Sequence, residues 1–327
     1  LVVINPMASP ASFLLELHHY NTSGVPAATS SGWYLPAGGQ VEVDLAAAFS
    51  TQYLVDTDYV LLRASAPVAA ASQMAADGFL AVLALQPQRD ILAADGQTTP
   101  VPAPADLFAP QFAVGGGWWT RLALLNADPA AAADVVLTAF YSVGGAPLST
   151  EVTLHLNPGE KKAADVRQLF GLSPGGGILD GWIRARCSRS LVQGAVLFGN
   201  DSGAYLSAQP LARTALKRML FGHIASGPAG SLDYFTGLAL LNPSDAQARV
   251  WVTVHDPSGA VLQTTSDPIV LAPGQRLSQM ITDYFPDLGP TLGGWIEVQA
   301  DQGLLGYVLF GDTALQFLSA VPPMAVE

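Results

Sequence analysis

The sequence has few charged residues, one cysteine and no long apolar run. Of its 327 residues, 12% are charged and 50% are hydrophobic, whereas about 25% of an average soluble domain is charged. Cys187 is the single cysteine, which excludes an intramolecular disulfide and a zinc site built from several thiolates. No apolar run approaches the roughly 18 residues of a membrane-spanning helix. We therefore expect no membrane span, and a surface that is covered to an unusual extent by neighbouring modules or by a partner.

The balance of charge argues against nucleic-acid binding. The net charge is −12, and a protein that neutralises phosphates needs a basic surface. The charges are also unevenly distributed: residues 1–107 hold two basic and nine acidic residues, residues 108–220 ten and seven, and residues 221–327 two and ten. A basic middle third between two acidic thirds favours attraction within or between chains. Drift between duplicated modules is the alternative explanation.

The strongest pattern is a threefold internal repeat. Leu1-Val-Val-Ile-Asn5 recurs as Leu122-Ala-Leu-Leu-Asn126 and as Leu238-Ala-Leu-Leu-Asn242. The same landmarks then follow in the same order in each copy. They are a turn glycine (Gly24, Gly145, Gly259), a phenylalanine (Phe49, Phe170, Phe285), an aromatic residue (Tyr59, Trp182, Trp295) and a closing proline (Pro87, Pro210, Pro322). This agreement predicts three copies of one module.

Apolar residues alternate within each copy, which is typical of strands with one buried face. In the third copy the predicted buried face is Val250, Val252 and Val254. Alignment on the turn glycine assigns the same positions to Leu15, Leu17 and His19 in the first copy and to Val136, Thr138 and Phe140 in the second. A second turn follows at Pro36-Ala-Gly38, Pro158-Gly159 and Pro273-Gly274. Turn signals at this spacing indicate two antiparallel sheets per copy.

The predicted fold class is therefore all-β, with three tandem antiparallel β-sandwich (Ig-like) modules in a rod. The predicted modules span residues 1–87, 108–211 and 221–327. A proline-rich connector occupies residues 88–107 and a short basic one occupies residues 212–220. Helix is expected only in short pieces, such as residues 163–170 and the connector at residues 213–219.

The first copy lacks a segment that the other two contain. Residues 108–121 precede the Leu-Ala-Leu-Leu-Asn strand of the second copy and residues 221–237 precede that of the third, whereas the first copy begins on the matching strand. Either upstream sequence has been removed, or the first sandwich is incomplete and a strand from another molecule closes it. The second interpretation makes Leu1, Val2, Val3 and Ile4 a candidate assembly edge.

Patterns of serine-hydrolase and nucleotide-binding sites do not withstand a mechanistic test. Gly171-Leu-Ser-Pro-Gly175 has the G-x-S-x-G form, but the residue after the nucleophile must donate its backbone N–H to the oxyanion and Pro174 has none. The sequence contains no P-loop and no dinucleotide fingerprint. We therefore predict no catalytic residue and no cofactor site.

Metal-binding patterns are equally weak. His18 and His19 are neighbours on a predicted strand, so their side chains point to opposite faces and do not chelate one ion together. Asp56 and Asp58 would share a strand face, but nothing nearby completes a glycosidase pair or a calcium loop. We predict no metal site from the sequence, and we interpret Cys187 as a small buried hydrophobic residue.

Three tryptophans suggest a second kind of function. Trp118 and Trp119 follow a triple glycine, and Trp33 follows Gly32. Exposed aromatic faces of this kind stack on sugar rings, which predicts a glycan-binding surface. The alternative is that these rings pack inward or cover a strand edge.

Residues 108–126, which read Phe-Ala-Pro-Gln-Phe-Ala-Val-Gly-Gly-Gly-Trp-Trp-Thr-Arg-Leu-Ala-Leu-Leu-Asn, resemble a repeat of secreted and cell-surface proteins of environmental bacteria. The likeness extends to the strands that lead to Leu197-Phe-Gly199 and Leu309-Phe-Gly311. The first copy departs from it, because Asp58-Tyr59 stands where the other copies have Gly-Trp. The resemblance implies β-sandwich modules outside the bacterial cytoplasm and brings no activity and no catalytic residue.

These observations favour a non-catalytic structural or adhesive protein, located outside the cell or on its surface. The expected partners are further copies of the chain in a self-assembling filament or layer, other surface proteins, or glycans. A glycan-binding protein that uses Trp33, Trp118 and Trp119 is the alternative. An enzyme whose site lies between modules is the third hypothesis.

Overall fold

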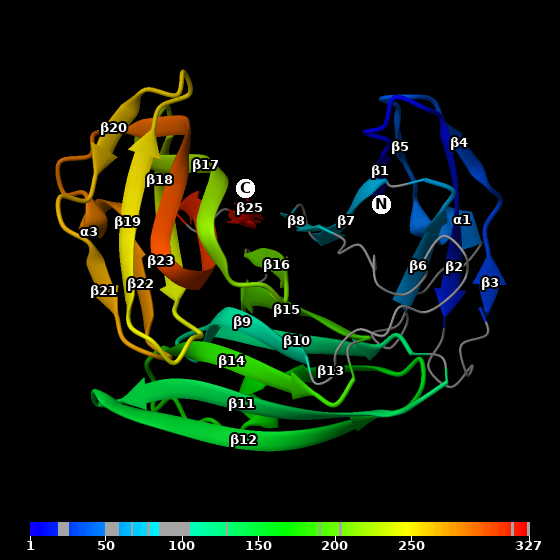
Figure 1. The fold of residues 1–327 in the computed structure, drawn as a ribbon, viewed down its shortest axis with the longest axis horizontal. Coiled ribbons are helices and arrows are strands. Elements are labelled where there is room, and N and C mark those ends of the chain that lie inside the picture. The colour runs from blue at the N-terminus through cyan, green and yellow to red at the C-terminus, as the bar shows by residue number, and fades with distance from the viewer. Residues whose placement is uncertain are drawn as a thin grey trace.

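The computed structural model describes residues 1–18, 26–49, 59–66, 68–76, 79–84, 105–128, 130–189, 191–202, 205–314 and 317–325. This part of the chain is all-β, as predicted, and its three helices have only four or five residues each. None of these helices is long and apolar enough to cross a membrane. The strands form several antiparallel sheets, grouped in three successive segments (Figure 1).

The first segment, residues 1–84, contains two sheets. One has the strand order β5-β1-β7-β8. In the other, β2 pairs with β6 along one side and with β3 and β4 along the other, since Phe13, Glu16 and Leu17 each have two strand partners. The elements are β1 (Val2–Ile4), β2 (Ala11–His18), β3 (Ala28–Thr29), β4 (Trp33–Leu35), β5 (Gln40–Glu42), α1 (Leu45–Phe49), β6 (Tyr59–Ala64), β7 (Ala69–Ala76) and β8 (Phe79–Ala84).

The second segment, residues 105–211, contains two four-stranded sheets that share one hydrophobic core. Their orders are β12-β11-β14-β9 and β13-β10-β15-β16, and both contribute to the same cluster of buried side chains. This arrangement is consistent with a β-sandwich. The elements are β9 (Ala105–Val114), β10 (Trp118–Asn126), β11 (Ala133–Val143), β12 (Ala146–Leu156), β13 (Lys161–Asp165), α2 (Val166–Leu169), β14 (Leu179–Cys187), β15 (Val192–Asn200) and β16 (Leu206–Pro210).

The third segment, residues 216–325, repeats the main pairings of the second, but one strand runs through both of its sheets. Its strand β23 is 22 residues long, and pairs first with β17 and β19 and then with β18 and β24. It therefore takes the place of both β14 and β15. The elements are β17 (Leu216–Ala229), β18 (Leu232–Leu241), β19 (Ala248–His255), β20 (Val261–Thr264), β21 (Ile269–Leu271), β22 (Arg276–Met280), α3 (Ile281–Tyr284), β23 (Thr291–Asp312), β24 (Leu318–Val321) and β25 (Met324–Ala325).

The alternation of buried residues confirms the prediction for the third copy and corrects it for the second. Val250, Val252 and Val254 are all fully buried. In β11, however, the fully buried residues are Val135, Leu137 and Ala139, one position away from the predicted set of Val136, Thr138 and Phe140. The prediction was shifted because it was aligned on Gly145. Strands β11 and β12 pair as far as Val143 and Ala146, so their turn consists of Gly144 and Gly145 alone.

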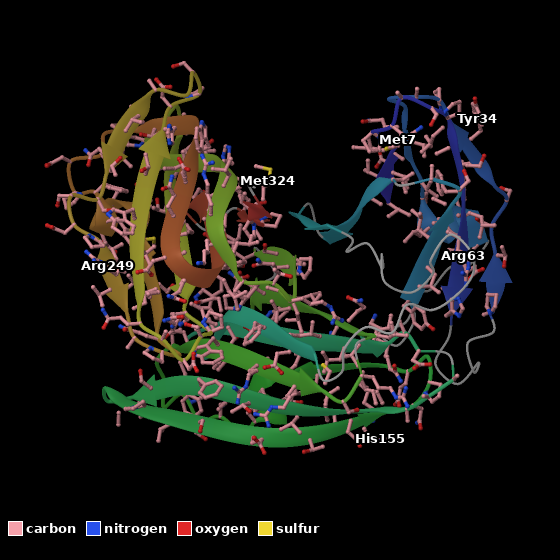
Figure 2. All side chains as sticks on the ribbon, in the orientation of Figure 1. Met7, Tyr34, Arg63, His155, Arg249 and Met324 are labelled. Atoms are coloured by element: carbon pink, nitrogen blue, oxygen red, sulfur yellow. The ribbon has the colours of Figure 1, made fainter. Side chains whose placement is uncertain are left out.

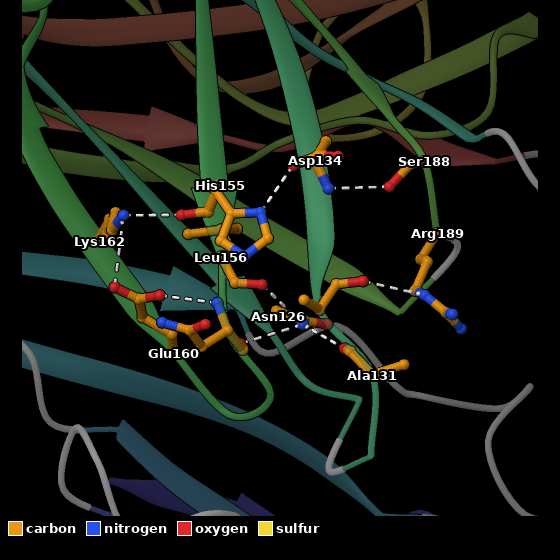
Figure 3. Close-up of polar contacts among 11 residues, drawn as sticks. Asn126, Ala131, Asp134, His155, Leu156, Glu160, Lys162, Ser188 and Arg189 are labelled. Carbon is orange, nitrogen blue, oxygen red and sulfur yellow. Dashed lines mark hydrogen bonds and ion pairs between the residues drawn. The ribbon is translucent and has the colours of Figure 1, made fainter.

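A buried asparagine occurs at the same place in all three segments. Asn5, Asn126 and Asn242 have no exposed surface. In the second segment the Asn126 Nδ2 group donates to the carbonyl oxygens of Ala131 (2.8 Å), Leu156 (3.3 Å) and Asn157 (3.1 Å), as Figure 3 shows in part. Its Oδ1 accepts the N–H of Asp128. The Asn126 side chain thus joins the end of β10 to the turn that follows β12.

The asparagines of the other two segments make equivalent contacts. Asn5 donates to the carbonyls of Ser9, Leu35 and Pro36. Asn242 donates to the carbonyls of Ala246, Leu271 and Ala272. Their Oδ1 atoms accept from the N–H groups of Met7 and Ser244. Each joined turn contains a glycine with positive φ, at 67° or 68° in Gly38, Gly159 and Gly274, which is the conformation that a type II turn requires. The second turn predicted from the sequence is therefore confirmed in each copy.

The segments do not follow one another in a row, so the predicted rod is not observed. In Figure 1 the first and third segments rise from the same side of the second, and β8, β16 and β24 come together between them. Two predicted boundaries also shift. Strand β9 begins at Ala105 within the predicted connector of residues 88–107, whose residues 88–104 lie outside the described part. Strand β17 begins at Leu216, so the helix predicted for residues 213–219 is wrong.

The second and third segments are packed together through aromatic residues. Tyr307 lies in the core cluster of the second segment and its ring contacts that of Phe198, with 5.5 Å between the centroids. Tyr205 donates its hydroxyl to the carbonyl of Asp312 (2.7 Å). Around Trp182, a smaller cluster includes Leu241 and Leu305 of the third segment. Arg276 forms an ion pair with Asp180 and a hydrogen bond with Gln111 across the same interface.

Replacement of the buried asparagine should destabilise the protein. The Asn126→Ala variant leaves three carbonyl oxygens without this donor, so we expect the free energy of unfolding to fall by about 3 kcal/mol. Urea unfolding followed by tryptophan fluorescence measures the change. The matched control is Asn157→Ala, an exposed residue of the adjoining turn, for which we expect less than about 0.5 kcal/mol. Equal stability of the two variants would contradict this role.

Candidate interaction edge

The residues predicted to form an assembly edge do not lie at an edge. Strand β1 has β5 on one side and β7 on the other, and Val2, Val3 and Ile4 pair with both. The amino group of Leu1 donates to the carbonyl of Val43 (2.9 Å), and the N–H of Val43 donates back to Leu1 (2.7 Å). The prediction that Leu1, Val2, Val3 and Ile4 form an open edge is therefore wrong, because β1 is paired along both of its sides.

Among the described residues of the first segment, strand β6 has partners on one side only. Its counterparts are flanked on both sides, β14 by β11 and β9 and β23 by β19 and β17. Strand β6 pairs with β2, and no described residue pairs with its other side. The correspondence is residue by residue: Leu62 lies opposite Leu15 as Ala185 lies opposite Leu137 and Val298 opposite Val252.

The backbone groups on this open side can be assigned. Ser65 donates its N–H to the carbonyl of Ser12 (2.8 Å), as Ser188 does to Asp134 (2.9 Å). Backbone groups of an antiparallel strand alternate between its two sides. The N–H and C=O groups of Val60, Leu62 and Ala64 therefore point away from β2. These are the positions at which β14 pairs with β9, through Ile183, Ala185 and Cys187.

The open side leaves the core of the first segment partly covered. Ile183, Ala185, Ile296 and Val298 are at most 1% exposed. Val60 and Leu62, which take the same positions, are only partly buried although they pack against the local core. The edge therefore combines unpaired backbone groups with apolar side chains, the two requirements for addition of a strand.

A cluster of charged and aromatic residues lies beside the edge. Arg63, labelled in Figure 2, donates its Nε to Glu16 (2.7 Å) from the edge strand itself. His18 is nearly buried, lies 3.3 Å from the same carboxylate and stacks on Tyr59 with 4.9 Å between the ring centroids. Burial raises the pKa of the Glu16 carboxyl, and hydrogen bonds with Arg63 and His18 lower it by a larger amount. The pKa of Glu16 therefore lies below its ordinary value.

The third segment builds the same cluster from different strands. His255 stacks on Trp295 with 3.6 Å between the centroids and lies 3.6 Å from the Glu297 carboxylate. Here the arginine is Arg218, which donates its Nε to Glu297 (2.6 Å) from β17, the strand that covers this edge. The carboxyl of Glu297 also has a lowered net pKa, because hydrogen bonds from Gln299 and Arg218 outweigh the effect of burial.

The three tryptophans predicted to bind glycans are engaged with their own chain. Trp33 stacks on Phe13, with 5.1 Å between the centroids, and Trp118 stacks on Tyr205, at 5.2 Å. Trp119 lies so close to Gly199 that a Cβ at that position would be 2.0 Å from the indole. All three are partly buried, and Trp33 lies on a different segment from the other two. The alternative prediction, that these rings pack against the protein, describes their contacts.

The remaining candidate residues do not come together in the described part of the chain. No group of three or more His, Cys, Asp or Glu residues there could hold a metal ion. Cys187 is fully buried, and burial raises the pKa of its thiol to about 12. His19, Asp56 and Asp58 lie outside the described residues. Two open cavities of about 310 and 390 Å³ share residues 288–290 of the third segment.

No protein-family model and no curated protein matches the chain. Among solved structures, Thermotoga maritima 1070 is similar with 13% identity and a TM-score of 0.28, over 35% of this chain and 97% of its own. A β-glucuronidase of Bacteroides uniformis is similar with 11% identity and a TM-score of 0.19, over 66% of this chain and 26% of its own. Likenesses of this size assign neither a fold family nor an activity.

The sequence analysis placed the unpaired edge of the first copy at Leu1 to Ile4, whereas the described pairings leave one side of β6 without a described partner. Residues Val60, Leu62 and Arg63 were not singled out, although Tyr59 was recognised as the counterpart of Trp182 and Trp295. The signal was present in that alignment, because β14, the strand that contains Trp182, pairs with the opening strand β9. To apply this pairing to the strand of Tyr59, the sequence analysis would have needed a rule that relates strands about 70 residues apart.

Hydrogen exchange should reveal the open edge. The amides of Val60 and Leu62 face away from β2 and have no described partner, whereas those of Ile183 and Ala185 face β9. We therefore expect the first pair to exchange about tenfold faster or more. The amides of Leu61 and Arg63 face β2 and serve as controls on the same strand. Exchange of the purified protein, resolved by residue, tests this. Equal protection of all four β6 amides would contradict an open edge.

The stability of the protein should decrease in acid through Glu297. Since the pKa of this carboxyl is lowered on folding, its contribution is present at pH values above 4.5, its ordinary pKa, and is lost as the pH falls through the lower, folded value. We expect the urea midpoint of the wild type to fall more steeply between pH 6 and about pH 3 than that of Glu297→Gln. The variant Glu42→Gln, which removes an exposed carboxylate, controls for the change in net charge.

Proposed function

We propose that this chain is a non-catalytic structural protein of a bacterial cell surface or extracellular layer, built from three tandem Ig-like β-sandwich modules. The modules are supported by the threefold occurrence of one buried contact, at Asn5, Asn126 and Asn242. They are also supported by the equivalent strand pairings of the three segments. In this proposal the role of the protein depends on the exterior of the modules.

The observation that carries the proposal is the open side of β6. Of three equivalent strands, two are covered by an opening strand and one is not covered by any described residue. Addition of a strand from a neighbouring molecule would satisfy the backbone groups of Val60, Leu62 and Ala64 and cover two apolar side chains. The chain then assembles with its neighbours by the pairing that it uses internally.

Two other functions have less support. Glycan binding through Trp33, Trp118 and Trp119 requires free ring faces, and two of these rings stack on aromatic neighbours. An enzyme with a site between modules requires polar residues that converge there. At the interface of the second and third segments, the residues that meet are mainly apolar, such as Trp182, Leu241 and Leu305.

Electron microscopy of the purified full-length chain under native conditions tests the assembly. We expect ordered filaments or layers from the wild type. The Ala64→Pro variant removes an N–H from the open side and leaves the bonds between β2 and β6 in place, so its assembly should be lost. The matched control Ala64→Val keeps the N–H and should assemble. Dispersed monomers of the wild type would refute self-assembly.

A further inference from the structure

The joint between the second and third segments is formed by one face of a sheet of the third segment. Alternate residues of β18 point into the core of that segment, and the others, Ala239 and Leu241, point away from it. These two lie opposite Tyr307 and Leu305 of β23, and all four side chains are at most 3% exposed. The second segment covers them, since Tyr307 lies in its core cluster and Leu305 packs with Trp182.

The third copy has residues at this joint that the second copy lacks. Equivalent positions follow from the strand that ends in the buried asparagine, because it pairs in the same register with β15 in the second segment and with β23 in the third. The counterparts of Leu305 and Tyr307 are Gln193 and Ala195, which are only partly buried. Two large apolar residues thus occupy the covered face, where the second copy has a polar residue and a small one. The joint is therefore encoded in the sequence of the third copy.

A charged contact lies beside these apolar residues. Arg276, which lies opposite Leu241, forms an ion pair with Asp180 and a hydrogen bond with Gln111 of the second segment. Its side chain is only 14% exposed. The two partners are bound through two different nitrogens of one planar guanidinium group. The counterpart in the second copy is Lys161, whose single ammonium nitrogen lacks this rigid fork. The contact therefore fixes the angle between the segments as well as their proximity.

We infer that the second and third segments fold and unfold as one cooperative unit with a fixed relative orientation, and that Leu305, Tyr307 and Arg276 specify this joint. Separation of the segments would expose the apolar side chains of the joint to water. It would also open the core of the second segment at Tyr307. Unfolding of the third segment removes the same cover, so it lowers the stability of the second. This inference goes beyond the proposed function, because a stiff elbow sets the direction of the third segment whether or not the chain assembles.

Native-state hydrogen exchange of the full-length chain measures the coupling. Val252→Ala weakens the core of the third segment at a residue outside the joint. We expect the slowest amides of β11, in the second segment, to exchange about tenfold faster or more, by the same factor as those of β19 in the third. The matched control Val261→Ala changes a residue that is 60% exposed, so exchange in both strands should stay within about twofold. Faster exchange in β19 alone would overturn the inference.

A variant that carries the residues of the second copy should release the joint. The double change Leu305→Gln and Tyr307→Ala gives β23 the residues that β15 has at these positions. In this background we expect Val252→Ala to speed exchange in β19 and to leave β11 within about twofold. Equal acceleration of both strands in the double variant would show that these side chains do not specify the joint.

Distances between spin labels test the fixed orientation. Val143→Cys and Val261→Cys place one label on each segment at exposed positions, while Cys187 is fully buried. The distance distribution should be narrow in the otherwise unchanged chain and about twice as broad or more in the double variant, because segments without a tight apolar interface move relative to each other. A broad distribution in the first case, or an equally narrow one in the second, would refute the elbow. Leu305→Gln alone should also broaden it, and decides the question if the double variant does not fold.

Discussion

The contact of a buried asparagine side chain with a turn is the constraint on which each segment depends. The amide of Asn126 has no access to water, so its two hydrogens and its oxygen must all find partners within the protein. The carbonyls of Leu156 and Asn157 supply two of them from a turn about 30 residues away. Aspartate lacks the donors for this geometry, and glutamine is longer by one methylene group. The contact therefore fixes where β10 ends and where the chain turns from β12 into β13.

Local features of the fold could be read from the sequence, whereas pairings across the fold could not. The second turn and the buried face of β19 were predicted correctly, because each depends on residues within about ten positions of one another. The phase of β11 was wrong by one residue, since a two-residue turn on Gly144 and Gly145 replaced the longer turn of the third copy. The arrangement of the segments depends on contacts such as Tyr307 with Phe198, which no periodicity encodes. The same limit explains the edge, because β6 lies far in the sequence from Leu1 to Ile4, the residues predicted to form it.

The charged clusters of the first and third segments pair a carboxylate with an arginine in two different ways. In the third segment the carboxylate of Glu297 takes its arginine from the covering strand β17. In the first segment, where no described strand covers β6, the carboxylate of Glu16 takes Arg63 from the edge itself. A charged residue on an edge strand discourages indiscriminate pairing.

The continuous strand β23 has a consequence for how the protein yields under stress. In the second segment, β14 and β15 are separate strands joined by a short loop, so one sheet has some freedom to loosen while the other stays closed. In the third segment a single backbone runs through both sheets from Thr291 to Asp312. Tension applied at its C-terminal half is passed along the covalent chain into the pairings with β17 and β19. We therefore expect the two sheets of the third segment to open together under a pulling force.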